Sequence, residues 1–307
     1  MKISKKPIWG IDLGGTKVEG IIMRASEKPE VIERLRIPTE REKGYEHVLG
    51  QIKHLLEMLS EKSGLIPEKI GIGTPGTLDP ITELLKNSNT TILNDKLFKK
   101  DLEALIDIPI KIANDANCFA LAEATFGAVK ALDFKPQVVF GVILGTGVGG
   151  GLVVDGKVIN GRQGIAGEWG HNFLDESGGP CYCGKEGCVE TVISGTALEK
   201  FYSMRSGSAL PLQEIVKRYE AGDDMEARAT MGRLVKYFGK AISVVIDIVD
   251  PDVVILGGGV GNISQLYTEG VDWAGKFVFN NRLDTMFLRP SLGDSAGVFG
   301  AALLATE

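Results

Sequence analysis

Two glycine-rich stretches with the same layout constrain the fold most strongly. Residues 10–22 read GIDLGGTKVEGII and residues 141–153 read GVILGTGVGGGLV, each an apolar segment, a glycine-rich turn and a second apolar segment. Strand, turn and strand in close succession favour a β-hairpin, so the repeat predicts a duplicated core in which each half opens with a hairpin. A chance match between short glycine-rich segments is the alternative. The matching pairs are Gly10 with Gly141, Leu13 with Leu144, Gly14 with Gly145 and Gly20 with Gly151.

The rest of the chain alternates predicted strands with predicted helices, which indicates an α/β fold. We expect a smaller N-terminal α/β domain (residues 1–113 with 298–307) and a larger C-terminal one (114–297), with a hinge near residues 113–115. The predicted strands cover residues 31–39, 69–76, 108–115 and 251–257, and the predicted helices cover 45–62, 116–128, 226–249 and 293–305. The last helix begins with a Gly-Asp-Ser start signal.

Charge and hydropathy exclude several classes of partner. The formal net charge of −6 argues against nucleic acid, which requires a basic face. No apolar run reaches the roughly 18 residues that span a bilayer, and the start of the chain has no signal-peptide region. We therefore expect a cytoplasmic protein that binds neither nucleic acid nor membrane. A small anionic ligand stays possible, because backbone N–H groups can bind phosphate without net positive charge.

The two glycine turns are candidate phosphate-binding loops. The sequence GTGVGG (145–150) matches the dinucleotide fingerprint, but that fingerprint needs a helix directly after the loop, and here an apolar strand follows. A glycine turn between two strands can still direct several N–H groups at a phosphate. Three ordinary tight turns, the third being the triple glycine below, are the alternative. The candidate phosphate-binding residues are Asp12, Gly14, Gly15, Thr16, Lys17, Gly145, Thr146 and Gly147, with Asp12 placed to orient a hydrated Mg²⁺.

A third glycine cluster follows a predicted buried strand near the C-terminus. Gly257, Gly258 and Gly259 stand side by side in the sequence LGGGVGN. Glycines leave a flat surface without side chains, which suits the adenine and ribose of a nucleotide. Together with the two turns, they predict a nucleoside triphosphate as ligand.

Three of the four cysteines lie close together in the chain with one histidine. His171, Cys181, Cys183 and Cys188 are spaced H-x9-C-x-C-x4-C, and nearby glycines permit a tight loop. Three thiolates and an imidazole form a tetrahedral set that favours structural Zn²⁺ and leaves no open position. Reduced surface thiols and an iron–sulfur site are the alternatives. The fourth cysteine, Cys118, is expected to be a small buried apolar residue.

Two glutamates bracket this cluster. Glu168 lies three residues before His171, and Glu190 lies two residues after Cys188. Closing the loop on zinc would bring both carboxylates together, with the second ring nitrogen of His171 left as a donor. Such a set suits a ligand rich in hydroxyl groups, such as a sugar. Solvated loop residues are the alternative for each glutamate.

One carboxylate is a candidate general base. Asn114 and Asp115 stand where a predicted strand ends and a predicted helix begins. The structural interpretation is an N-cap pair. The functional one is that Asp115 accepts the proton of a sugar hydroxyl during phosphoryl transfer, which depends mainly on alignment and charge stabilisation. The helix N-terminus is expected to lower the pKa of this carboxylate.

Taken together, these motifs resemble the ROK family of sugar kinases and repressors. The resemblance runs from GIDLGGTK to GDSAGVFGAA, and GEWGH followed by CYCGKEGC is its most specific part; LKNSNTTILN and IANDANC are similar to the manno(fructo)kinase branch. The interval from His171 to Cys181 is short, as in the glucokinase-like members. The resemblance implies a two-domain actin-like ATPase fold with a cleft between the domains, and a homodimer.

The resemblance also implies roles for individual residues. Asp115 would be the catalytic base, the two glycine turns would bind the phosphates of ATP, and the glycines from Gly257 to Gly259 would lie beside the adenosine. The residues implied to bind the sugar are Gly76, Asn89, Asn114, Asp115, Glu168, His171 and Glu190.

The expected function is an ATP- and Mg²⁺-dependent hexokinase that phosphorylates the 6-hydroxyl of free fructose, mannose or glucose. A kinase for N-acetylglucosamine or another acylamino sugar is the alternative within the same chemistry. A sugar-binding regulator without catalysis is the alternative from another class. The family's repressors carry a helix-turn-helix before the first phosphate loop, whereas only nine residues precede Gly10 here. The sequence does not identify the sugar, because pocket volume depends on how loops fold.

Overall fold

The computed structural model describes residues 6–25 and 29–306, which divide into two compact units. The first unit comprises residues up to 135, residues 151–166 and residues from 291 onward, and the second comprises residues 136–150 and 167–290. Each is described by itself below. A hinge is a site of motion between domains, which one structure does not test, so the expected hinge near residues 113–115 stays a prediction. Within the described ranges, no helix is both long and apolar enough to cross a membrane.

The first unit contains a five-stranded sheet of order β3-β2-β1-β4-β7. Its hairpin strands β1 and β2 are antiparallel, as are β2 and β3, whereas β4 lies parallel to β1 and β7 lies parallel to β4. Because β1 and β4 are buried, both read as nearly continuous apolar runs. The strands are β1 (Ile8–Leu13), β2 (Lys17–Arg24), β3 (Glu30–Pro38), β4 (Ile70–Thr74) and β7 (Ile110–Asn114), with a small ribbon of β5 (Thr77–Leu78) and β6 (Leu85–Lys86).

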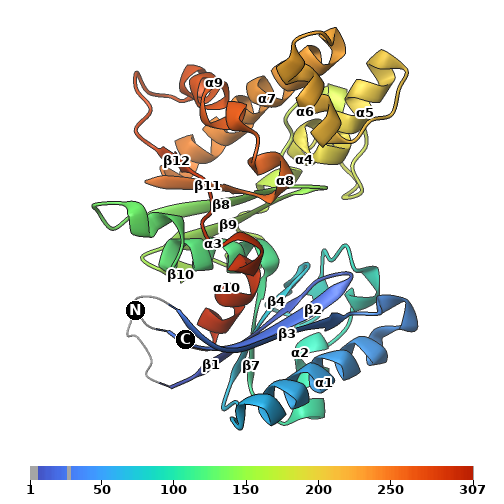
Figure 1. Cartoon of the computed structure of the whole chain (residues 1–307), viewed down its shortest axis with the longest axis vertical. Helices are drawn as coiled ribbons and strands as arrows, with labels where there is room; N and C mark the ends of the chain where they lie inside the picture. Colours follow the sequence, from blue (N-terminus) through green and yellow to red (C-terminus); the bar gives the residue numbers. More distant parts are fainter. Residues whose placement is uncertain (1–5, 26–28, 307) are drawn as a thin grey trace. The chain divides into compact units, whose positions relative to one another are not determined.

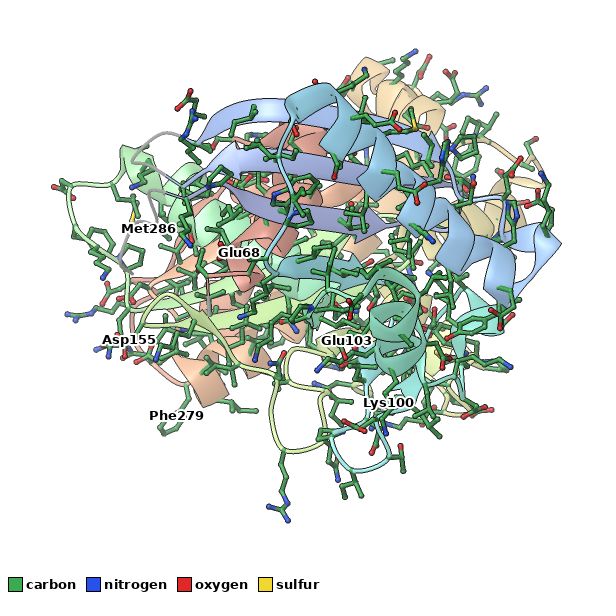
Figure 2. All side chains as sticks on the ribbon, turned by 90° about the horizontal axis from the view of Figure 1, so that it is seen from below. Glu68, Lys100, Glu103, Asp155, Phe279 and Met286 are labelled. Carbon is green, nitrogen blue, oxygen red and sulfur yellow. The ribbon has the colours of Figure 1, made fainter. Side chains whose placement is uncertain are left out.

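Helices cover both faces of this sheet (Figure 1). Helices α1 (Tyr45–Ser63) and α2 (Phe98–Ile106) pack on one face, and α10 (Ala296–Leu304) packs with α3 (Asp115–Thr125) on the other. On α2, Glu103 (labelled in Figure 2) accepts a hydrogen bond from the backbone N–H of Ile110 at 2.8 Å. This bond fixes the start of β7, the strand that ends at the candidate base.

The second unit is built around β8 (Val138–Leu144), β11 (Val253–Gly257) and β12 (Met286–Leu288). These strands belong to a sheet of order β10-β9-β8-β11-β12, in which β11 is parallel to β8 and to β12. The long helix α7 packs against α4, α5, α6 and α9. The remaining bounds are β9 (Val148–Val154), β10 (Lys157–Val158), α4 (Val189–Ile193), α5 (Gly195–Ser206), α6 (Leu212–Ala221), α7 (Met225–Val249), α8 (Gly258–Gly261) and α9 (Glu269–Phe277).

The two sheets share one topology, as the duplicated glycine pattern predicts. In each sheet the first strand in the chain lies in the middle. The second and third strands follow it toward one edge, and the fourth and fifth follow it toward the other edge. Strand β9 follows the GTGVGG turn directly, so this turn lacks the helix that a dinucleotide fingerprint requires. The expected helix near residues 293–305 forms as α10, which begins directly after the Gly-Asp-Ser start signal. Ser295 makes no side-chain cap, and its hydroxyl instead accepts a hydrogen bond from Arg34 Nη1 at 2.8 Å.

Close packing of α10 on α3 depends on Gly300. A Cβ built on Gly300 would lie 1.8 Å from the backbone oxygen of Cys118, an approach that only a shift of the backbone can relieve. We expect Gly300→Ala to lower the free energy of unfolding by about 3 kcal/mol, measured by denaturant titration. Gly50→Ala is the matched control, because its Cβ would enter open space on α1. That change should stabilise the protein by up to about 1 kcal/mol. Equal effects of the two substitutions would contradict the packing argument.

Candidate active site

The first candidate phosphate loop, between β1 and β2, is fixed by hydrogen bonds at both ends. The N–H of Gly14 donates to the Lys17 carbonyl at 2.9 Å, which closes the turn. Thr39, fully buried at the end of β3, donates from its hydroxyl to the Gly14 carbonyl at 2.7 Å and from its N–H to the Thr16 carbonyl at 3.0 Å. The side chains of Thr16 and Lys17 are exposed and can meet a ligand.

Asp12 lies half-buried just before this loop. Burial, followed by the negative charges of Asp115 and Glu19, raises the pKa of its carboxyl to about 7. The charge of Lys17 opposes that rise. Because ionisation of Asp12 is disfavoured by its carboxylate neighbours, a cation placed beside it would be stabilised. This environment fits the expected Mg²⁺.

The candidate base stands where β7 passes into α3. Asn114 is the N-cap, and the N–H of Ala116 donates both to Asn114 Oδ1 at 2.9 Å and to Asp115 Oδ1 at 2.8 Å. Asp115 keeps an exposed surface, yet the protein around it raises the pKa of its carboxyl, and the bond from Ala116 only partly offsets this. The expectation of a lowered pKa is therefore wrong, because desolvation outweighs the helix N-terminus. A raised pKa makes this carboxylate a better proton acceptor.

The residues of the first unit that were expected to bind sugar lie together. Asn114 Nδ2 donates to the Gly76 carbonyl at 3.2 Å. Gly76 has φ of +81°, and a Cβ there would lie 2.8 Å from the backbone nitrogen of Ser88. Asn89 is the next residue and is exposed. Gly76, Asn114 and Asp115 thus lie together, and the segment that carries Asn89 passes beside Gly76 at Ser88.

The second candidate phosphate loop is held by two helices of the second unit. The Gly145 N–H donates to the Gly147 carbonyl at 2.9 Å and closes the turn. At the start of α5, the Gly195 N–H donates to the Gly145 carbonyl at 2.8 Å, and the Thr196 hydroxyl donates to the Thr146 carbonyl at 3.1 Å. From α4, Glu190 accepts the N–H of Val148 at 2.9 Å, which ties a predicted sugar-binding residue to the phosphate loop.

A pocket of about 490 Å³ opens beside this loop, within the size range of small-molecule sites. Of the three consecutive glycines, Gly259 lines the pocket. Gly257 is buried in β11, and Gly258 has φ of +81° with no room for a side chain, since a Cβ would lie 2.2 Å from the Leu144 carbonyl. The pocket lining also includes Gly145, Thr146, Glu199, Leu212, Val216, Val260 and Ile263.

The predicted metal ligands converge. The ligand atoms of His171, Cys181, Cys183 and Cys188 all lie within 4.8 Å of one another. The Cys181 Sγ is 3.6 Å from His171 Nδ1, and the Sγ atoms of Cys183 and Cys188 are 3.6 Å apart. Three sulfur donors and one imidazole nitrogen so arranged fit a tetrahedral Zn²⁺. Cys118 is completely buried, lies in the other unit and takes no part.

Sequence reasoning missed Tyr182. Its hydroxyl lies 3.0 Å from His171 Nε2, the ring nitrogen that faces away from the cysteines, and the two rings are perpendicular. Partial burial, followed by the charges of Glu190 and Glu168, raises the pKa of Tyr182 to about 12. His171 therefore contacts this hydroxyl, and the charges of Glu168 and Glu190 act on it. The available signal was its position between two predicted ligands, because loop closure must carry it to the histidine.

Comparison with known proteins follows this geometry. The fold and its two glycine hairpins define an α/β phosphotransferase of the actin-like ATPase type. The ROK family model matches residues 8–307, so the chain belongs to the ROK family, and it is a sugar kinase of that family. The crystal structure of a ROK hexokinase from Thermus thermophilus is similar, with a TM-score of 0.86, 31% identity and coverage of 98% of each chain.

Two further relatives bear on which class of sugar the protein phosphorylates. A ROK family glucokinase from Streptomyces griseus, crystallised with glucose and AMPPNP, has a TM-score of 0.77 and 26% identity, and the match covers 98% of this chain and 99% of that one. An N-acetyl-D-glucosamine kinase from Aliivibrio salmonicida is 36% identical over 306 residues, which cover 96% of this chain and 98% of the relative. The expected free hexose is thus less well supported than the acylamino-sugar alternative.

Proposed function

We propose that the protein is an ATP- and Mg²⁺-dependent N-acetylglucosamine kinase that phosphorylates the 6-hydroxyl of its sugar. The observation that carries phosphoryl transfer is Asp115, a carboxylate of raised pKa at a strand end, close enough to Asp12 to shift the pKa of that carboxyl. The acylamino sugar is favoured by curated relatives of that name at 33–36% identity over almost the whole chain.

In this proposal the first unit carries the chemistry. Asp115 accepts the proton of the 6-hydroxyl while the sugar oxygen bonds to the γ-phosphorus and the bond to the ADP oxygen breaks. Asn114, Asn89 and the backbone of Gly76 orient the sugar hydroxyls. Asp12 would hold hydrated Mg²⁺, which would supply positive charge to the phosphates. The protein contributes alignment and electrostatic stabilisation, which are the main requirements of phosphoryl transfer.

The second unit is proposed to bind the nucleotide and a further part of the sugar. The pocket beside Gly259 has a volume suited to adenosine, and Gly145 and Thr146 of the adjoining loop, which line the pocket, would place the loop backbone next to the phosphates. Zinc on the three cysteines and His171 Nδ1 would hold the loop and fix the proton on Nε2. Glu168 and Glu190 then accept hydrogen bonds from sugar hydroxyls. The sugar either replaces the Tyr182 hydroxyl as the partner of His171 Nε2 or forms a hydrogen bond with that hydroxyl.

Coupled ADP-release assays test the proposal and its alternatives. With N-acetylglucosamine, N-acetylmannosamine, glucose, mannose and fructose as substrates, we expect kcat/KM for N-acetylglucosamine to exceed that for any free hexose by at least about tenfold. A preference for fructose, mannose or glucose would restore the hexokinase expectation. Binding of a sugar by calorimetry without ADP release would favour the non-catalytic regulator instead.

A further inference from the structure

The segment that follows β3 brings a second cation, Arg41, to the first phosphate loop. Thr39 is bonded to both Gly14 and Thr16, so the chain leaves β3 against the loop. Glu40 then adopts φ of 51°, which is uncommon for a residue other than glycine and turns the backbone sharply. Arg41 comes next and opens the short 3₁₀ helix Arg41–Lys43.

The Arg41 guanidinium lies over Gly15 of the loop. A Cβ built on Gly15 would lie 3.0 Å from Arg41 Nη1 and 3.4 Å from the hydroxyl oxygen of Thr90. The guanidinium and the hydroxyl therefore both lie close to the loop backbone at Gly15. Thr90 directly follows Asn89 in the chain, so the segment expected to contact sugar lies next to the phosphate loop at Gly15.

Both side chains lack an acceptor. Over residues 6–25 and 29–306, the Arg41 guanidinium has no hydrogen bond or ion pair. The nearby acid Glu40 is instead paired with Lys43 at 2.8 Å and His47 at 2.7 Å. Within the same described ranges, Thr90 is only 2% exposed, and its buried hydroxyl has no hydrogen-bond partner. A buried hydroxyl is normally satisfied, so Thr90 is an unsatisfied donor beside the loop, and the exposed Arg41 guanidinium next to it is free to bind an anion.

Resting on the proposed kinase function, we infer that Arg41 binds the phosphoryl group in transfer, with Thr90 supporting it. Arg41 contacts the γ-phosphate of ATP and then the phosphate of the sugar product, and it makes no contact with ADP. A guanidinium suits this task because it is always charged and offers donors in a planar fork that matches phosphate oxygens. Its charge stabilises the negative charge on the equatorial oxygens in the transition state.

The inference predicts a selective loss in Arg41→Ala. We expect kcat to fall by about 100-fold, with Arg41→Lys recovering about tenfold of that loss. Affinity for a non-hydrolysable ATP analogue and for the sugar 6-phosphate should fall at least about fivefold, whereas affinity for ADP, measured by calorimetry, should stay within about twofold. A merely structural role for Arg41 would not separate ADP from the other two ligands.

Lys43→Ala is the matched control. It removes the same charge from the same 3₁₀ helix, but Lys43 is paired with Glu40 and should leave kcat within about twofold of the wild type. The inference is overturned if Arg41→Ala keeps kcat within about threefold, or if ADP and the analogue lose affinity equally. A last outcome separates the two proposals. If the wild type phosphorylates no sugar, but Arg41→Ala still lowers the affinity for the ATP analogue and not the affinity for ADP, the proposed function fails. The role of Arg41 as a phosphate ligand then stands.

Discussion

Asp115→Asn should lower kcat by about 10²- to 10⁴-fold, the loss typical when a general base is removed. The amide keeps the shape of the side chain and can still accept the Ala116 N–H that Asp115 Oδ1 accepts at 2.8 Å. It cannot accept a proton from the sugar hydroxyl. The affinity for the sugar, measured by calorimetry, should therefore stay within about threefold, and the loss should appear in kcat alone.

The same variant should keep its stability. Desolvation raises the pKa of Asp115, and its charge contributes to raising that of Asp12. Both effects mean that the ionised carboxylate is disfavoured in the folded state, so a neutral amide should not lower the unfolding temperature. Asn114→Ala is the comparison, because it removes the N-cap and should cost about 1 kcal/mol. If Asp115→Asn unfolded at lower temperature and lost sugar affinity, the residue would be structural and not the base.

Cys188→Ala should abolish zinc binding and weaken sugar binding. Cys188 is completely buried, and its Sγ lies 3.6 Å from that of Cys183, so its loss removes one of four donors without opening the surface. Metal analysis should fall from about one zinc per chain to none. Because zinc at this site would hold His171 in place, KM for the sugar should rise by about 10- to 100-fold, the usual effect of disturbing such a site.

Cys118→Ala is the matched control for the metal site. Cys118 is equally buried but lies in the other unit and is not one of the four clustered residues, so zinc content should be unchanged. Nucleotide affinity should also survive in Cys188→Ala, because the pocket beside Gly259 does not include the cysteine loop. Full zinc content in Cys188→Ala, or an unchanged KM for sugar, would exclude the proposed role. Chelation of the wild type should reproduce the variant.

Features encoded by short-range patterns could be predicted from the sequence. The two glycine hairpins are local, because glycine permits the turn and the apolar strands on each side specify the pairing. The metal set is local as well. Its four ligands lie between residues 171 and 188, and their chemistry alone favours zinc. The α/β class follows in the same way from alternating periodicities.

Features that depend on distant contacts required the tertiary structure. Asn114 bonds to Gly76 across 38 residues, and Thr39 bonds to Gly14 across 25. No local sequence pattern predicts either contact, because the same polar residue type occurs where a side chain contacts solvent and where it contacts a distant carbonyl. The sign of the pKa shift at Asp115 is a further case. The helix N-terminus next to it in sequence lowers the pKa, but the surrounding protein raises it more.

Sequence by itself determined the class of fold, and it singled out the glycine loops, the four candidate metal ligands and the carboxylate that we propose as base. These depend on residue type and short spacing, which the chain carries without folding. Only the tertiary structure placed Arg41 over Gly15, and it reversed the expected shift of the Asp115 pKa. The reason is physical: burial, contact and electrostatic field are properties of the neighbours that folding supplies, and those neighbours lie far away in the chain.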